Sequence, residues 1–161
     1  MRINSTIQFA SGPMRALVYK DIDGVVGLEG RNVQGVHAYC FCEGKLVLVH
    51  NGRHGWQPPG GHTEEGETIE QTVIREVQEE TNMRVISQRL MGFQDIHNPE
   101  GVITQTRSVC LVEPISEFKS DPAGDITEIK LIEPKEYKMY FDWGEVGDHL
   151  MKKALGLKEA L

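Results

Sequence analysis

Long apolar runs, cysteines and clusters of basic residues are all scarce in this sequence of 161 residues. No apolar run approaches the roughly 20 residues that span a bilayer, which excludes a protein anchored by membrane-spanning helices. The segment Met1 to Gln8 carries one arginine and then polar residues, where a secretory signal needs an apolar stretch. The three cysteines, an odd number, are typical of a reducing compartment. We therefore expect a cytoplasmic protein that does not bind a membrane.

Basic residues are spread thinly along the chain, and this excludes one further class of protein. Binding to a nucleic acid duplex needs a broad basic face, and the sequence has no cluster of lysines and arginines of that kind. The opposite charge is concentrated instead. The net charge is −7, and the segment from Gly60 to Met83 alone holds seven of the 24 acidic residues and one of the 17 basic residues. Such a local excess of carboxylates indicates a cation site.

The remaining composition is that of an ordinary globular protein, with 39% hydrophobic and 25% charged residues. Short apolar runs bounded by turn residues predict strands. These runs cover residues 14–19, 36–42, 46–50, 85–95, 107–112 and 126–132. The second and third runs are separated by Glu43-Gly44-Lys45, a spacing that predicts a β-hairpin.

Two helices are predicted as well. The first begins at Thr68, whose hydroxyl caps the helix while Gln71 reaches back in a capping box. It ends at about Thr81, because Asn82 tolerates the left-handed conformation of a helix end. The second spans about Glu145 to Leu157, where apolar residues recur at helical spacing. Strands before, between and after these helices predict a mixed α/β fold without an internal domain boundary.

Three glutamates of the first predicted helix crowd together. Glu76, Glu79 and Glu80 lie at positions i, i+3 and i+4, so they share one face, and Glu80 falls inside the apolar stripe of the helix. Like charges at this spacing destabilise a helix by roughly 0.2–0.5 kcal/mol per pair. A hard divalent cation such as Mg²⁺ or Mn²⁺ compensates such a cluster, since carboxylate oxygens suit it. The alternative is an acidic helix face that is simply solvated.

The context of these glutamates favours the cation. Gly61, five residues, Glu67, seven residues and then Arg75-Glu76-Val77-Gln78-Glu79-Glu80 resembles the Nudix box, the signature of the Nudix hydrolases. The family pattern has a glycine where this chain has Asn82, and asparagine adopts the same backbone conformation. The segment Trp56 to Gly61, which precedes the box, and the order of the strands are also similar to the family.

This resemblance implies a Nudix-type α/β/α sandwich with a mixed central sheet, formed by one Nudix hydrolase domain over residues 1–161. It implies hydrolysis, dependent on Mg²⁺ or Mn²⁺, of a diphosphate that links a nucleoside to a moiety X. A nucleoside triphosphate, a nucleotide sugar and ADP-ribose all remain open as substrates. Glu76, Glu79 and Glu80 match the metal ligands of the family, with the carbonyl oxygen of Gly61 or Gly60 as a further donor. Glu67 and Arg75 match positions that brace the loop and orient a ligating glutamate.

The identity of the general base stays open between two groups of residues. Some members of the family use a glutamate of the box, here Glu79 or Glu80. Others use an acid from a loop outside it, here Asp121, Asp125 or Glu128. Coordination to a cation lowers the basicity of the box glutamates. We therefore predict that Glu128 assists the attacking water, with Asp125 as the alternative and an idle charge at a strand end as the plain interpretation.

Substrate contacts are predicted for three further residues, each with a structural alternative. Arg53, near His50 and His54, is a candidate phosphate contact, although histidines on loops are commonly exposed and idle. Trp56 either stacks on a base or fills the core beneath the box loop. Arg107 either contacts substrate or forms a surface ion pair. Cys40 and Cys42 share a strand face and are expected to serve packing, because no second cysteine pair is present to hold a metal.

Weaker features bear on the substrate and on the class of protein. Pro99 stands where family members that cleave ADP-ribose carry a proline, but those members tend to have an additional N-terminal region, and only about 13 residues precede the first predicted strand. A Nudix-fold module that binds a ligand without turnover is the alternative function. An isomerase that uses Cys40 or Cys42 is disfavoured, because the box is intact. We expect a monomer or a homodimer.

Overall fold

All strands of the computed structural model, which describes residues 1–8, 12–22 and 27–161, belong to one sheet. Nine strands are present in the described residues, and their bounds are β1 Arg2–Gln8, β2 Met14–Asp21, β3 Val33–Cys42, β4 Lys45–Asn51, β5 Gly55–Gln57, β6 Gly60–His62, β7 Met83–Asn98, β8 Gly101–Pro114 and β9 Ile126–Ile132. The sheet runs in the order β1-β2-β7-β8-β3-β4-β5, while β6 pairs with β3 and β9 pairs with β4. The pairing of β3 with β8 is parallel and the other described pairings are antiparallel, so the sheet is mixed.

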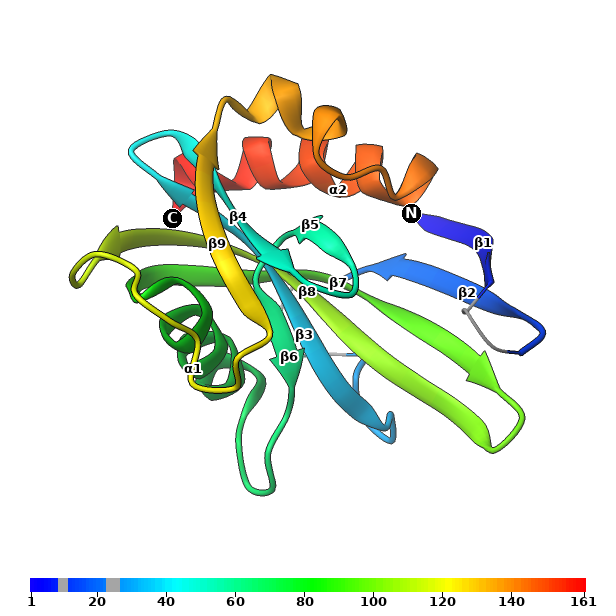
Figure 1. Ribbon diagram of the computed structural model, residues 1–161. Helices are drawn as coiled ribbons and strands as arrows, with labels where there is room; N and C mark the ends of the chain where they lie inside the picture. The colour runs from blue at the N-terminus through cyan, green and yellow to red at the C-terminus, as the bar shows by residue number, and fades with distance from the viewer. Residues whose placement is uncertain (9–11, 23–26) are drawn as a thin grey trace.

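Helices cover both faces of this sheet (Figure 1). Helix α1 spans Ile69–Thr81 and packs on one face, while α2, Gly144–Leu157, and the 3₁₀ segment η1, Pro134–Met139, pack on the other. The alternation of side chains along β3 divides the core accordingly. Val36, Ala38, Cys40 and Cys42 pack toward α1, whereas Tyr39 and Phe41 pack toward α2. The predicted α/β/α sandwich is confirmed, and so is the packing role of Cys40 and Cys42.

Helix α1 has the predicted ends. The Thr68 side chain accepts a hydrogen bond from the backbone N–H of Gln71, and the Gln71 side chain accepts one from the N–H of Thr68. Asn82 ends the helix in the left-handed region, with φ of 54°. In α2 the predicted apolar positions Val146, Leu150 and Ala154 are buried. No helix in the described parts of the chain has the length and apolar character needed to cross a membrane.

The six predicted strands are present, but three others were missed. The first strand is β1, so the expectation that about 13 residues precede the first strand is wrong. Its sequence is mostly polar and only Ile3 is buried, because β1 is an edge strand that pairs with β2 alone. Pro99 lies in the two-residue turn that joins β7 to β8, between the paired residues Asn98 and Gly101. This turn gives Pro99 a structural role that does not depend on the substrate.

Candidate functional site

Two glycines of β6 bring the sheet close to α1. Gly60 pairs with His37 and Gly61 with Val36 of β3. A Cβ atom on Gly60 would overlap the carbonyl oxygen of Val36, and one on Gly61 would overlap the carboxylate of Glu76. The absence of side chains therefore lets the middle of α1 lie directly against this strand, with its carboxylates beside exposed backbone groups.

Arg75 holds several acids on this side of the sheet. Its Nε and Nη2 donate to the two carboxylate oxygens of Glu67, at 2.8 and 2.9 Å, and Nη1 donates to Glu76 at 2.9 Å and Glu79 at 3.3 Å. Nη2 also donates to the carbonyl oxygen of His62 at 2.8 Å. The hydrogen bonds from Arg75 lower the pKa of Glu67 to about 2. These are the bracing contacts that the sequence predicted for Glu67 and Arg75.

Glu80 is the most buried of the three glutamates on this helix, with 5% of its surface exposed. It accepts a hydrogen bond from the backbone N–H of Gly60 at 2.8 Å, which favours the charged form of its carboxylate. Burial raises the pKa of Glu80 to about 8, and the negative charges of Glu76, Asp121 and Asp125 add to the effect. Burial also raises the pKa of Glu76, although Arg75 opposes it. Negative charge at this site therefore exceeds what Arg75 neutralises.

The three glutamates are separated by their own protein partners. Glu76 and Glu79 turn toward Arg75, while Glu80 turns toward Gly60. Within the described residues, no three acidic, histidine or cysteine side chains are arranged to hold a metal ion. The donors nevertheless fit a hard divalent cation, because they are all oxygen atoms and carry uncompensated negative charge. Glu76, Glu79, Glu80 and the Gly61 carbonyl are the groups that would hold it.

The acids predicted outside the box have different placements. Asp121 is buried, and its carboxylate accepts from the backbone N–H groups of Ala123, Asp125 and Ile126, each at 3.1 Å, so it shapes the loop before β9. Asp125 is exposed on that loop, and its charge acts on Glu80.

Glu128 is on the wrong side of the sheet for the predicted role. It pairs with His50 of β4. Strand alternation puts it on the same face as Ile132, which packs in the core beneath α2. The box glutamates project from α1, which covers the opposite face. The structure thus does not bring Glu128 to the box glutamates, and of the three outside acids Asp125 is the exposed one near them.

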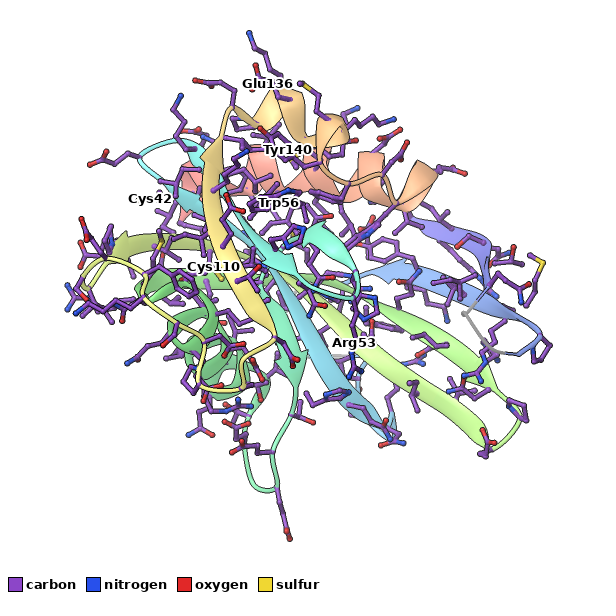
Figure 2. All side chains as sticks on the ribbon, in the orientation of Figure 1. Cys42, Arg53, Trp56, Cys110, Glu136 and Tyr140 are labelled. Carbon is purple, nitrogen blue, oxygen red and sulfur yellow. The ribbon has the colours of Figure 1, made fainter. Side chains whose placement is uncertain are left out.

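Arg53 and Trp56 lie on the β4–β5 hairpin, where the backbone N–H of Gly52 donates to the carbonyl oxygen of Asp125 at 3.3 Å. Arg53 is exposed in the turn between β4 and β5, where its backbone N–H donates to the Asn51 side chain at 2.8 Å. Trp56 packs against the α2-side core and contacts the rings of His50 and Tyr140, with centroid distances of 5.1 and 5.9 Å (Figure 2). The packing role of Trp56, one of its two predicted interpretations, is therefore the one that its contacts fit.

Arg107 is buried on the α2 side and lines a cavity of about 520 Å³. Its Nη2 donates to the Gln94 side chain at 2.8 Å and to the Gln105 side chain at 3.3 Å. Its guanidinium carbon lies 5.6 Å from the centre of the Trp143 ring. Burial lowers the pKa of Arg107 to about 10, which leaves it charged at neutral pH. The surface ion pair that was the alternative for Arg107 is wrong, because the side chain is not at the surface.

The cavity itself was missed by the sequence. One wall comes from β1 and β2, and another from Asp142 to Val146 at the start of α2. Trp143, two residues before the predicted helix start at Glu145, was the available signal, since tryptophan is enriched at interfaces. Nothing in the sequence of β1 indicated that this strand would form a wall of the cavity.

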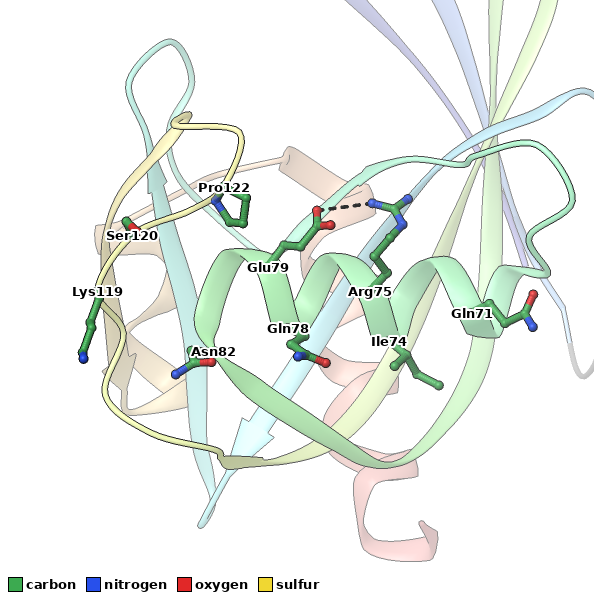
Figure 3. Close-up of a pocket in the computed structure, with 9 residues that line it drawn as sticks. All are labelled: Gln71, Ile74, Arg75, Gln78, Glu79, Asn82, Lys119, Ser120 and Pro122. Atoms are coloured by element: carbon green, nitrogen blue, oxygen red, sulfur yellow. Dashed lines mark hydrogen bonds and ion pairs between the residues drawn. The ribbon is translucent and has the colours of Figure 1, made fainter.

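A second hollow lies on the other side of the sheet, along the outer surface of α1. This groove of about 630 Å³ is bordered by Arg75 and Glu79 and by the segment from Lys119 to Pro122, which comes from the connection between β8 and β9. Figure 3 shows Arg75 and Glu79 at one side of the groove, joined by their ion pair. The acidic cluster is therefore open to solvent through Glu79, whose side chain is 36% exposed.

Comparison of the sequence with known proteins finds one family of domains. The sequence model of the NUDIX domain matches residues 32–153. The chain is 35% identical to the putative 8-oxo-dGTP diphosphatase YtkD of Bacillus subtilis over 71 residues, which are 43% of this chain and 45% of that protein. It is 50% identical to the asymmetrical bis(5'-nucleosyl)-tetraphosphatase of Sus scrofa over 38 residues, which are 24% of this chain and 26% of that protein. The chain spans less than half the length of the curated relatives it matches.

Solved structures share the fold over a larger part of the chain. The pyrophosphohydrolase BsRppH of Bacillus subtilis superposes with a TM-score of 0.70 at 23% identity, covering 89% of this chain and 92% of that one. The NUDIX domain of Shewanella oneidensis NrtR, solved with ADP ribose, superposes with a TM-score of 0.61 at 18% identity, covering 80% of this chain and 88% of that one. In both comparisons the likeness is one of fold. Strands β1 and β2 lie outside the residues that match the sequence model.

Proposed function

The chain belongs to the Nudix family, as the match over residues 32–153 establishes, and from this premise we propose that it hydrolyses a diphosphate linkage in a nucleoside diphosphate derivative with the help of a divalent cation. One observation carries the proposal. Glu76, Glu79 and Glu80 lie on one helix beside Gly60 and Gly61, with more negative charge than Arg75 neutralises. An acidic cluster of this kind attracts a cation and, through it, the phosphates of a substrate.

The residues around the cluster have separate tasks in this proposal. Glu76, Glu79, Glu80 and the Gly61 carbonyl hold Mg²⁺ or Mn²⁺, which when bound neutralises phosphate oxygens and lowers the pKa of water. Arg75 positions Glu76 and Glu79 through Nη1 while its other nitrogens are fixed by Glu67 and His62. The N–H of Gly60 fixes Glu80. Such bracing keeps ligating carboxylates in one orientation.

A proton must leave the attacking water, and two carboxylates are placed to take it. Asp125 is exposed and its charge acts on Glu80, so a water at the cluster is within the reach of its loop. Glu79 is the most exposed glutamate of the box and borders the groove beside α1. Asp125 is our preferred base, because a carboxylate that does not bind the cation keeps its basicity. Glu128 is set aside because of its position on the other face.

The substrate is proposed as a class rather than as one compound. The relatives are named for 8-oxo-dGTP and for a bis(5'-nucleosyl) tetraphosphate, and one structural neighbour was solved with ADP ribose. A nucleoside diphosphate linked to a further group is what these molecules share. A nucleoside triphosphate, a nucleotide sugar and ADP-ribose are therefore the substrates to test.

The test is a screen for released phosphate or monophosphate across these nucleotide classes, with Mg²⁺ or Mn²⁺ and again with excess chelator. We expect turnover of at least one class that stops in chelator and returns when the cation is restored. The same screen is run on Glu79→Gln, which removes the charge of a proposed metal ligand. Glu65→Gln is its matched control, since Glu65 is an exposed acid of the same segment. Undiminished turnover in chelator contradicts the metal proposal. Binding of a nucleotide in the presence of cation without any turnover supports the alternative of a ligand-binding module.

A further inference from the structure

Arg107 is a buried cation that forms no ion pair with an acid of residues 1–8, 12–22 or 27–161. Only 4% of its surface is exposed, and its Nε has no hydrogen-bond partner. The acceptors of its other nitrogens are neutral, namely the Thr106 carbonyl and the side-chain oxygens of Gln94 and Gln105. A buried guanidinium is costly unless all its donors are paired. An unsatisfied donor of this kind beside a cavity indicates that a ligand supplies the missing acceptor.

A second buried polar atom borders the same cavity. The Nδ1 of His37 has no hydrogen-bond partner, and His37 is the neighbour of Arg107 in the pairing of β3 with β8. Burial and the charge of Arg107 lower the pKa of His37 to about 3, so the imidazole is neutral at physiological pH. Its ring contacts the edge of Trp143, with centroids 5.2 Å apart. The polar end of the cavity thus combines a fixed cation with a neutral imidazole and a flat aromatic ring.

The remaining lining is suited to a flat and largely apolar group. Apolar side chains come from four elements, namely Ile3, Leu17, Ile96 and Val146. Two acids, Asp142 and Glu145, also line the cavity but are exposed, and neither forms an ion pair with Arg107. A planar ring that carries hydrogen-bond acceptors on one edge satisfies both the apolar walls and Arg107.

The cavity and the acidic cluster lie on either side of one strand pair. His37 lines the cavity and is paired with Gly60, whose N–H binds Glu80. A ligand with phosphates at one end and a planar ring at the other carries the groups that each of these two places lacks. A nucleotide is such a ligand.

We propose that this cavity selects nucleobases that present a carbonyl oxygen to Arg107, so that an oxopurine binds in preference to adenine. This inference rests on the proposed function, which supplies the nucleotide class of the substrate. It adds the type of base that binds and the residue that distinguishes it. Arginine pairs well with the O6 and N7 acceptors of an oxopurine, whereas adenine presents an amino donor at position 6. One wall of the cavity is formed by β1 and β2, which lie outside the residues that match the family, whereas Arg107 lies within them.

The test compares binding of inosine and adenosine 5'-monophosphates by calorimetry in excess chelator. The two ligands differ in the base edge at position 6 and are equal in sugar and phosphate. We expect the inosine compound to bind at least about tenfold more tightly. In Arg107→Met the ratio of the two affinities falls to within about threefold. Arg84→Met is the matched control, because Arg84 is an exposed arginine that pairs with Glu113, and it keeps the full ratio.

A second variant guards against an effect on folding. Gln94→Glu places a carboxylate where Arg107 already donates a hydrogen bond, so Arg107 gains an internal partner and the inosine compound loses its advantage while the fold is kept. Thermal unfolding checks both variants. Equal affinities in the parent, no binding of either compound at millimolar concentration, or an unchanged ratio in both variants overturns the proposal. Preserved discrimination without metal-dependent hydrolysis overturns only the proposed function.

Discussion

Two arginines of this protein have opposite surroundings. Arg75, in α1, donates to Glu67, Glu76 and Glu79, and Glu80 on the same helix accepts from the backbone N–H of Gly60. Arg107, beneath α2, donates only to neutral oxygens and keeps one donor without a partner. The first region holds more negative charge than its arginine neutralises, and the second holds a positive charge that pairs with no acid among the described residues.

The difference between the two regions shows that each carries a buried charge that the neighbouring residues do not balance. Burial raises the pKa of Glu80 at the first and lowers the pKa of Arg107 at the second, so each favours loss of its charge in the absence of a partner. A cation completes the first region and a group rich in acceptors completes the second. A nucleotide with a divalent cation carries both, which is why we propose it as the ligand of the two regions.

Removing charge from the first region has the largest expected effect. Glu79→Gln and Glu80→Gln preserve shape but remove the charge of a ligand, and we expect each to lower turnover at least about a hundredfold. In the absence of cation, and at a pH above about 8 where Glu80 is charged, we expect both variants to be no less stable than the parent, because repulsion on α1 is relieved. Steady-state rates and thermal unfolding in chelator measure the two effects. Near-full activity of a variant shows that its glutamate is a surface charge only.

Disturbing the geometry of the first region, with its charge intact, has the next largest effect. Gly61→Ala adds a methyl group that overlaps the Glu76 carboxylate, and we expect roughly a tenfold or greater loss of turnover as that carboxylate moves. Gly52→Ala is the control, because nothing lies within 4 Å of its added methyl group and its backbone is unstrained. The measurement is the turnover rate of both variants and of the parent at saturating cation. Equal rates for the two variants mean that the position of Glu76 is not critical.

The dependence of stability on pH separates the two regions. Between about pH 5 and 8 folded Glu80 keeps a proton that the unfolded chain has lost, since burial raises its pKa to about 8. Glu80 therefore makes the cation-free protein less stable as the pH rises through this range, by about 1–3 kcal/mol, and Glu80→Gln removes this contribution. Arg107 adds nothing there, because its pKa of about 10 lies above the range. His37 acts in the opposite direction below about pH 6.5, because the unfolded imidazole takes up a proton there while folded His37, with a pKa of about 3, stays neutral. Denaturant unfolding of the parent and of Glu80→Gln across this range is the measurement, and a difference between the two curves that does not fall with pH contradicts the prediction.

The smallest expected effects concern the base. Asp125→Asn lowers turnover by about tenfold and shifts the pH profile of the rate, because the proton acceptor is lost. Glu128→Gln keeps the rate within about twofold, because Glu128 is on the other face of the sheet. Rates across pH at saturating Mg²⁺ test both. If both variants keep the parental profile, the base is a glutamate of the box.

The parts of the molecule that were predictable from sequence are those specified by neighbours along the chain. Helix α1 was predicted with both ends because Thr68, Gln71 and Asn82 act within a few residues of where they stand. The box glutamates follow from the same helix. Strand β1 was missed because an edge strand with one buried residue has little apolar signal.

The remaining features depend on contacts between distant segments. Which face Glu128 occupies follows from the pairing of β9 with β4, which includes an irregularity between His50 and Asn51. Alternation along one strand cannot reveal that choice, since a shift of one residue reverses it. Arg107 was singled out as a candidate substrate contact, but the cavity that it lines depends on β1 and on Trp143, which are far from it in sequence.

The single parallel pairing among the described strands, β3 with β8, has a consequence for how the protein folds. The hairpins β3–β4 and β7–β8 join segments that are adjacent in the chain, whereas the pairing of β3 with β8 joins segments on either side of α1. Closing long loops costs entropy before the contacts form, so such pairings are slow. His37 meets Arg107 across this pair, and His37 also meets Gly60 of β6. The cavity is therefore complete only after this long-range pairing has formed, whereas the contacts of the acidic cluster, such as those of Arg75 with Glu67 and of Gly60 with Glu80, join residues nearer in the chain.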